Sequence, residues 1–172
     1  MTMQKHDASR DDLVKEGLAH LNEFRKVHKA RATKPRATFH EDFSSAQQVE
    51  PSMIETDLAD YYLASAGSLK LEKHEGKQSI RMDHEGGRGL ILLVRFRRDF
   101  SHARGLIKLD AFFCELSFRK GISHIIGDRQ YLGSPEPQTF DGPVNAKGEV
   151  FDMLDFYLTE TSGNLLSLSV TE

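Results

Sequence analysis

The hydrophobic pattern of this chain has two periods, and the first is helical. Between residues 10 and 29, apolar side chains recur at steps of three and four, the spacing of one helical face. They are Val14, Leu18, Leu21, Phe24 and Val27. Asp7 or Ser9 stands where a helix-capping side chain is expected. The pattern therefore predicts an amphipathic helix that buries one face.

A second helix is predicted at about Ser52–Ala66. Ser52 and Glu55 have the S-x-x-E spacing of a capping box directly after a proline. Gly67 stands where a glycine commonly ends a helix. One apolar face would hold Ile54, Leu58 and Tyr61 or Tyr62. Residues 30–51, with Pro35 and little periodicity, are expected to form an extended, basic, mobile connector.

From Leu69 onward the period changes to two, which is typical of β-strands. Alternation on both sides of Glu75-Gly76-Lys77 predicts a β-hairpin. A two-residue loop at Glu75-Gly76 would pair Leu71 with Ile80, and one at Gly76-Lys77 would pair Leu71 with Met82. Either register places the apolar residues on one face.

Further strands follow in the second half of the chain. Residues 89–100 alternate as one long strand, with Arg95 and Arg97 on the face opposite Phe96. Residues 105–118 are too long for a simple strand, and their pattern shifts near Asp110–Phe112, which indicates a bulge or a bend. Strands are also expected at Ser123–Ile126 and Gln130–Leu132. The sequence predicts a Pro- and Gly-rich loop over 133–149 and a second hairpin over 151–172, with its turn at Ser162-Gly163-Asn164.

These elements predict an α+β fold. Two N-terminal helices would be followed by a mainly antiparallel β-sandwich or partly closed barrel of about seven to eight strands. We expect residues 1–50 to form an N-terminal helix and basic extended connector. Residues 51–172 would form a globular β-rich domain that the capped helix opens.

Composition narrows the class of protein. A single cysteine, Cys114, excludes an internal disulfide and zinc sites built on several cysteines. The sequence has no secretory signal pattern, and its longest apolar run is far shorter than the roughly 20 residues of a membrane span. We therefore expect a soluble, cytoplasmic protein. Homo-oligomerisation is left open.

The net charge of −3 conceals blocks of opposite sign. Residues 25–36 carry six Lys or Arg and no acid, and residues 88–120 carry eight against three acids. Alternating arginines on one strand lie about 6–7 Å apart, which suits adjacent phosphates or carboxylates. The candidate anion- or partner-binding residues are Arg88, Arg95, Arg97, Arg98, Arg104 and Lys108. A candidate auxiliary basic arm holds Arg25, Lys26, Lys29, Arg31, Lys34 and Arg36.

The favoured hypothesis is a non-catalytic binding module whose arginine-bearing sheet face engages an acidic protein or a phosphate-bearing ligand. Nucleic acid is a further candidate partner for the basic arm. The competing interpretation is a solvated strand face, in which Arg95 and Arg97 pair with acids on a neighbouring strand such as Asp155 or Asp83.

Two other function classes stay open. One is an assembly protein, such as a small virion component with a basic arm and a β-sandwich. The other is a small hydrolase or transferase that uses His102, Cys114 or His124. The histidines show no metal-binding spacing, and no nucleotide-binding motif is present. We therefore predict no metal, no cofactor and no assigned catalytic residue.

Overall fold

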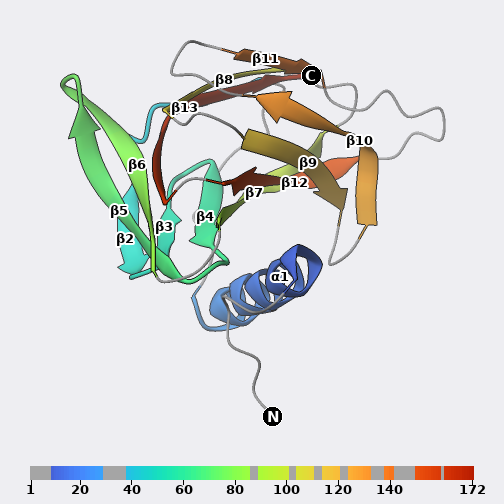
Figure 1. Cartoon of the computed structure of the whole chain (residues 1–172), viewed down its shortest axis with the longest axis horizontal. Helices are drawn as coiled ribbons and strands as arrows, with labels where there is room; N and C mark the ends of the chain where they lie inside the picture. Colours follow the sequence, from blue (N-terminus) through green and yellow to red (C-terminus); the bar gives the residue numbers. More distant parts are fainter. Residues whose placement is uncertain are drawn as a thin grey trace.

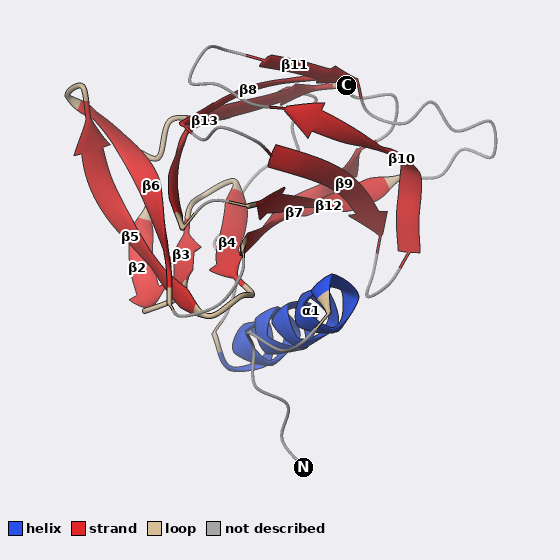
Figure 2. Ribbon diagram, viewed as in Figure 1, coloured by secondary structure: helices blue, strands red, loops and turns tan. Residues whose placement is uncertain are grey.

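A computed structural model describes residues 9–28, 38–85, 89–100, 104–110, 114–120, 124–132, 138–141, 150–159 and 161–172. Over these residues the chain forms one helix, α1 (Arg10–Val27), and thirteen strands in two antiparallel sheets. Figure 1 shows the helix beside one sheet, on the side away from the other sheet. The fold is a β-sandwich with a single helix on its outer surface (Figure 2).

The first sheet has six strands. Its order is β11-β8-β13-β6-β5, and β1 pairs with the C-terminal half of β13. The bounds are β1 Thr38–Glu41, β5 Gly67–His74, β6 Lys77–His84, β8 Arg104–Asp110, β11 Gln138–Asp141 and β13 Ser162–Thr171.

The second sheet has seven strands in the order β10-β9-β12-β7-β4-β3-β2. The bounds are β2 Gln47–Glu50, β3 Met53–Glu55, β4 Ala59–Leu63, β7 Leu90–Phe100, β9 Cys114–Lys120, β10 His124–Leu132 and β12 Phe151–Leu158. Strands β4, β7, β12 and β9 lie side by side at its centre, and their outer face meets α1 (Figure 1).

Two hydrophobic clusters hold these layers together. The larger lies between the sheets and includes Leu92, Phe118 and Phe156 from the seven-stranded sheet. The smaller joins the apolar face of α1 to residues such as Leu93 on the outer face of that sheet. The central strands are therefore buried on both faces, since each face meets another layer.

Helix α1 forms where the periodicity predicts it. The Ser9 hydroxyl accepts a hydrogen bond from the Asp12 backbone N–H at 3.2 Å, which caps the helix. Gly17 allows close approach to the sheet, because a Cβ atom there would lie 2.7 Å from the Leu93 Cδ1 atom. The described helix is too short and too polar to cross a membrane.

The first predicted hairpin and the long strand over 89–100 are confirmed. Strands β5 and β6 pair Leu71 with Ile80, the register of a two-residue loop at Glu75-Gly76. Glu75 and Gly76 have φ values of 51° and 79°, and positive φ at both positions is what a type I′ turn requires. In β7 the even-numbered residues from Leu90 to Phe96 face the inter-sheet core.

The predicted second helix is wrong. Ser52–Ala66 contains β3 and β4 instead, and the Glu55 carboxylate binds Arg25 rather than capping a helix. Every residue of β4 is buried, because one face meets the opposite sheet and the other meets α1. A strand buried on both faces shows no alternation, so its sequence mimics a helical spacing.

The predicted α+β fold is therefore wrong in its helix pair. The two sheets also do not close into a barrel, and the sandwich is the alternative that the structure supports. The connector over 30–51 contains strands β1 and β2, and the loop over 133–149 contains β11.

The second predicted hairpin is also wrong, because β12 and β13 belong to different sheets. Strand β12 already pairs with β7 and β9 on its two edges, so β13 crosses to the other layer. Both strands still point their apolar residues into the same core, and alternation alone does not distinguish these arrangements.

Candidate functional site

An irregularity in β7 opens the outer face of the seven-stranded sheet. Strand β7 pairs with β12 at Arg95↔Met153 and again at Phe100↔Phe151. Between these points β7 has four residues, 96–99, whereas β12 has only Asp152. Pairing with β4 also ends at Phe96. Extra residues of this kind bend a strand and redirect its side chains, and they recur beside functional sites.

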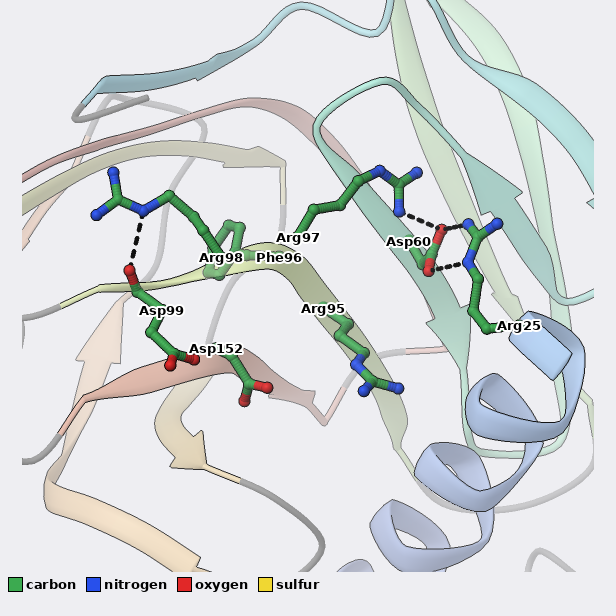
Figure 3. A pocket seen from close by; sticks show the side chains of 8 residues that line it. All are labelled: Arg25, Asp60, Arg95, Phe96, Arg97, Arg98, Asp99 and Asp152. Atoms are coloured by element: carbon green, nitrogen blue, oxygen red, sulfur yellow. Dashed lines mark hydrogen bonds and ion pairs between the residues drawn. The ribbon is translucent and has the colours of Figure 1, made fainter. Parts of the chain in front are cut away.

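The resulting hollow, which we call the β7 groove, has a volume of about 470 Å³. It lies beside the C-terminal end of α1 (Figure 3). This volume falls within the roughly 300–1,000 Å³ of small-molecule sites. The lining residues are Arg25, Asp60, Arg95, Phe96, Arg97, Arg98, Asp99 and Asp152.

The Asp60 carboxylate holds one side of the groove. Its side chain is 4% exposed and forms ion pairs with Arg25 from α1 and Arg97 from β7. Arg25 also donates to Glu55 at 2.6 Å, and Arg97 donates to the Thr56 carbonyl oxygen. Figure 3 shows Asp60 between the two guanidinium groups. These contacts join α1, β4 and β7 into one rigid wall.

The electrostatics of this wall favour charged arginine. Burial lowers the pKa of Arg25, but the hydrogen bonds and charges of Asp60 and Glu55 outweigh burial and raise it. Arg25 therefore remains a cation that cross-links the helix to the sheet.

Arg95 and Asp152 line the groove on its other side. Arg95 donates to the side-chain oxygen of Asn22 on α1, a neutral group. Asp152 lies 3.7 Å from the Lys120 ammonium, beyond hydrogen-bond distance. Asp99 accepts a hydrogen bond from Lys120 at 2.6 Å, and this bond raises the pKa of that lysine.

Arg98 follows the edge of the groove toward the C-terminus. Its guanidinium lies 4.4 Å from the centre of the Phe100 ring and donates to Glu172 at 3.0 Å. It also donates to the carbonyl oxygen of Asp99 (Figure 3).

The predicted basic patch is not supported. Four arginines line the groove together with three aspartates, so most of the positive charge is neutralised. Arg97 does pair with an acid on a neighbouring strand, but the acid is Asp60 rather than Asp155 or Asp83. Those two bind Arg119 and Arg81 respectively. The required acids lie far apart in the sequence and meet only in the folded sheet.

The other predicted site residues are dispersed. Arg25 alone of the described basic-arm residues reaches the groove, whereas Lys26 is exposed and pairs with Glu23. Arg104 and Lys108 lie on β8 in the other sheet. Outside the described residues are Arg88, Lys29, Arg31, Lys34, Arg36, His102 and the side chains of Cys114 and His124.

Sequence reasoning missed Asn22, Asp60 and Asp152 as groove residues. Asp60 interrupts an apolar run between Ala59 and Tyr61, and a charged residue inside a buried strand is a usable signal. Asp152 offered no comparable signal, because the irregular pairing of β7 with β12 is what places it there. Across the part of the chain that the structure describes, no three His, Cys, Asp or Glu side chains form a metal-binding group.

No protein-family model matches the chain, and no curated protein matches it. Solved structures similar to it include a point mutant of CBM29-2, a family 29 carbohydrate binding module. The TM-score is 0.48 at 12% identity, covering 66% of this chain and 81% of that chain. Another is the C-terminal family 22 module of Clostridium thermocellum Xyn10B, with a TM-score of 0.45 at 10% identity, covering 77% and 92%. CBM6cm-2 from Cellvibrio mixtus lichenase 5A gives 0.39 at 11%, covering 63% and 88%. Similarity at this level does not establish a family.

Proposed function

We propose that this protein is a non-catalytic binding module and that the β7 groove holds a neutral, hydroxyl-rich ligand, namely a carbohydrate. The observation that carries the proposal is the lining of the groove. Guanidinium and carboxylate groups lie around one hollow in nearly balanced number, four to three.

Hydroxyl groups match this lining because each one both donates and accepts a hydrogen bond. Arginine only donates, and an ionised aspartate only accepts. A sugar with several hydroxyls therefore satisfies both kinds of group at once. A phosphate or an acidic peptide would instead meet the carboxylates of Asp60, Asp99 and Asp152, which oppose a like charge.

Hydrogen bonding must supply most of the affinity. Among the described residues, the large hydrophobic side chains that are exposed are Val27 and Leu106, and neither is aromatic. Phe96 lines the groove but is only 4% exposed. Without an exposed ring for a sugar to stack on, we expect weaker binding than at aromatic sugar sites.

Affinity electrophoresis through gels that contain neutral polysaccharides tests this proposal. We expect at least one glucan, mannan or xylan to retard the protein. Arg97→Ala, which removes part of the groove wall, should abolish the retardation. Arg81→Ala on the six-stranded sheet is the matched control and should bind normally, because Arg81 pairs with Asp83 away from the groove.

The anionic alternatives serve as competitors in the same experiment. Inorganic phosphate and a sulfated polysaccharide should displace the neutral polymer poorly. Retardation by the sulfated polymer alone, or by no polymer, contradicts a neutral sugar ligand.

A further inference from the structure

The β7 groove has two sides that differ in how many hydrogen bonds they have left to give. We call Arg25, Asp60 and Arg97 the framework side, and Arg95 with Asp152 the open side. Both sides line the same hollow (Figure 3).

The framework side is already occupied by its own contacts. Both oxygens of Asp60 accept hydrogen bonds, Oδ1 from Arg25 and Arg97 and Oδ2 from Arg25 at 3.1 Å. Arg25 Nη1 and Arg97 Nε make no hydrogen bond, but both atoms are buried, which keeps them from a ligand. Breaking these pairs would leave buried charges without partners, so a ligand gains little by replacing them.

The open side has unused capacity. A guanidinium carries five donors, and the only hydrogen bond that Arg95 makes within the described part of the chain goes to Asn22. The carboxylate of Asp152 is 19% exposed, and its one ion pair there is the 3.7 Å approach of Lys120. A donor group and an acceptor group therefore face the groove, each with most of its capacity available.

The strand pairing explains why Arg95 and Asp152 do not neutralise each other. Arg95 is the last residue of β7 that pairs with β12 before the irregularity. Asp152 is the single β12 residue opposite the four-residue excursion of β7. The two side chains rise from adjacent strands on either side of the widened gap, and they form no ion pair (Figure 3). A ligand group that fits between them can contact both.

We propose that Arg95 and Asp152 together bind a pair of adjacent hydroxyls on one sugar ring. The Arg95 guanidinium donates to one hydroxyl oxygen, and the Asp152 carboxylate accepts the proton of the neighbouring hydroxyl. Asn22 acts as a positioning residue that holds the guanidinium from α1. This inference rests on the proposed function and narrows the ligand to neutral sugars with a free vicinal diol.

The pair also predicts which sugars are excluded. A methyl ether at the hydroxyl that faces Asp152 removes its donor and leaves a half-buried carboxylate without a partner. A carboxylate in place of that hydroxyl brings two negative charges together. Discrimination should therefore be strong against ethers and acids at this position.

Calorimetric titration of the full chain with cellohexaose, mannohexaose and xylohexaose tests the pair. For the hexasaccharide that binds best, Arg95→Ala and Asp152→Ala should each weaken binding about tenfold, the usual loss for a charged hydrogen-bonding group. The double variant should lose less than the product of the two, because both residues contact one diol. The O-methylated hexasaccharide should fail to bind.

The controls separate this inference from the proposed function. Arg81→Ala should bind like the original protein, and thermal unfolding should show that every variant is folded. If the original chain binds a hexasaccharide but both single variants bind it within twofold, the Arg95–Asp152 pair is wrong and the binding function stands. If the original chain binds none of the three, the proposed function fails as well.

Discussion

The two ends of α1 meet the seven-stranded sheet through similar charged groups with different outcomes. At its N-terminal end lies a cluster that we call the clamp, formed by Arg10, Asp11, Glu115, Arg119 and Asp155. At its C-terminal end lies the β7 groove. Both combine arginines of the helix and the sheet with buried aspartates.

The clamp is closed. Arg119 is 1% exposed, and its Nε atom lies 3.0 Å from an oxygen of Asp155, whose side chain is fully buried. The Nε atom of Arg10 lies 3.2 Å from the same oxygen, and Arg10 also binds Glu115 at 2.6 Å. A second contact fixes Arg119 to Asp11 on the helix.

Strand register explains the difference between the two ends. Asp155 lies where β12 pairs regularly with Leu93 of β7 and Ser117 of β9, so its neighbours close tightly over it. At the groove β7 and β12 separate around residues 96–99, and a hollow remains. Similar chemistry thus gives a structural anchor where pairing is regular and a candidate binding site where it is not.

The strongest way to break the clamp is Asp155→Ala. It leaves the buried Arg119 without its carboxylate, and breaking a buried pair in this way costs about 3–5 kcal/mol of unfolding free energy. Urea denaturation measures the loss. The control is Asp83→Ala, whose partner Arg81 is about one-third exposed and whose pair is worth about 1 kcal/mol or less. Equal losses in the two variants would show that the clamp does not stabilise the fold.

Asp60→Ala tests the corresponding anchor in the groove. Arg25 and Arg97 are partly exposed and keep Glu55 and the Thr56 carbonyl as partners, so we expect a smaller loss of about 2–3 kcal/mol. Sugar binding should also fall, because the wall loses its shape. The measurement pairs urea denaturation with calorimetry, and a variant that is destabilised but binds unchanged would remove the framework side from the site.

The smallest effect concerns Glu41, which contacts the groove wall from behind. Its buried carboxylate accepts hydrogen bonds from the hydroxyls of Thr56 at 2.5 Å and Tyr61 at 2.9 Å, and the Thr56 carbonyl holds Arg97. Burial raises the pKa of Glu41 above its ordinary value of 4.5, although these hydrogen bonds oppose the rise. The folded protein therefore retains a proton that the unfolded chain releases, and stability falls as the pH rises from 4.5 through the raised pKa.

Glu41→Gln should flatten this part of the profile of unfolding free energy against pH. Asp42→Asn is the matched control with the opposite sign. Hydrogen bonds from Ser44 lower the pKa of Asp42 below 3.8, so its contribution is present above that pH and is lost as the pH falls further. A Gln variant whose slope above pH 4.5 matches that of the original chain would contradict a buried, protonatable Glu41.

Much of the fold was readable from local sequence. The step of Val14, Leu18 and Leu21 gave the helix, and the alternation in residues 89–100 gave β7 with its two faces. These succeed because each element has one face in the core and local spacing reports that face. β4 failed for the converse reason, since α1 covers its second face and removes the alternation.

The candidate site was predicted only in part. Arg95, Arg97 and Arg98 were singled out correctly as neighbours, and all three line the groove. Their charge state in the fold was not predictable, because Asp60 and Asp152 come from β4 and β12 through pairings that no local pattern specifies.

The sequence by itself determined the capped helix, the first hairpin, the two faces of β7 and the set of arginines on one of them. These depend on the period of the backbone and on turn chemistry, which act over a few residues. Tertiary structure alone decided which sheet each strand joins, which acids neutralise the arginines, and where β7 parts from β12. Those outcomes depend on strand pairing between distant segments, and a shift of register there changes the side chains that meet without altering the local pattern.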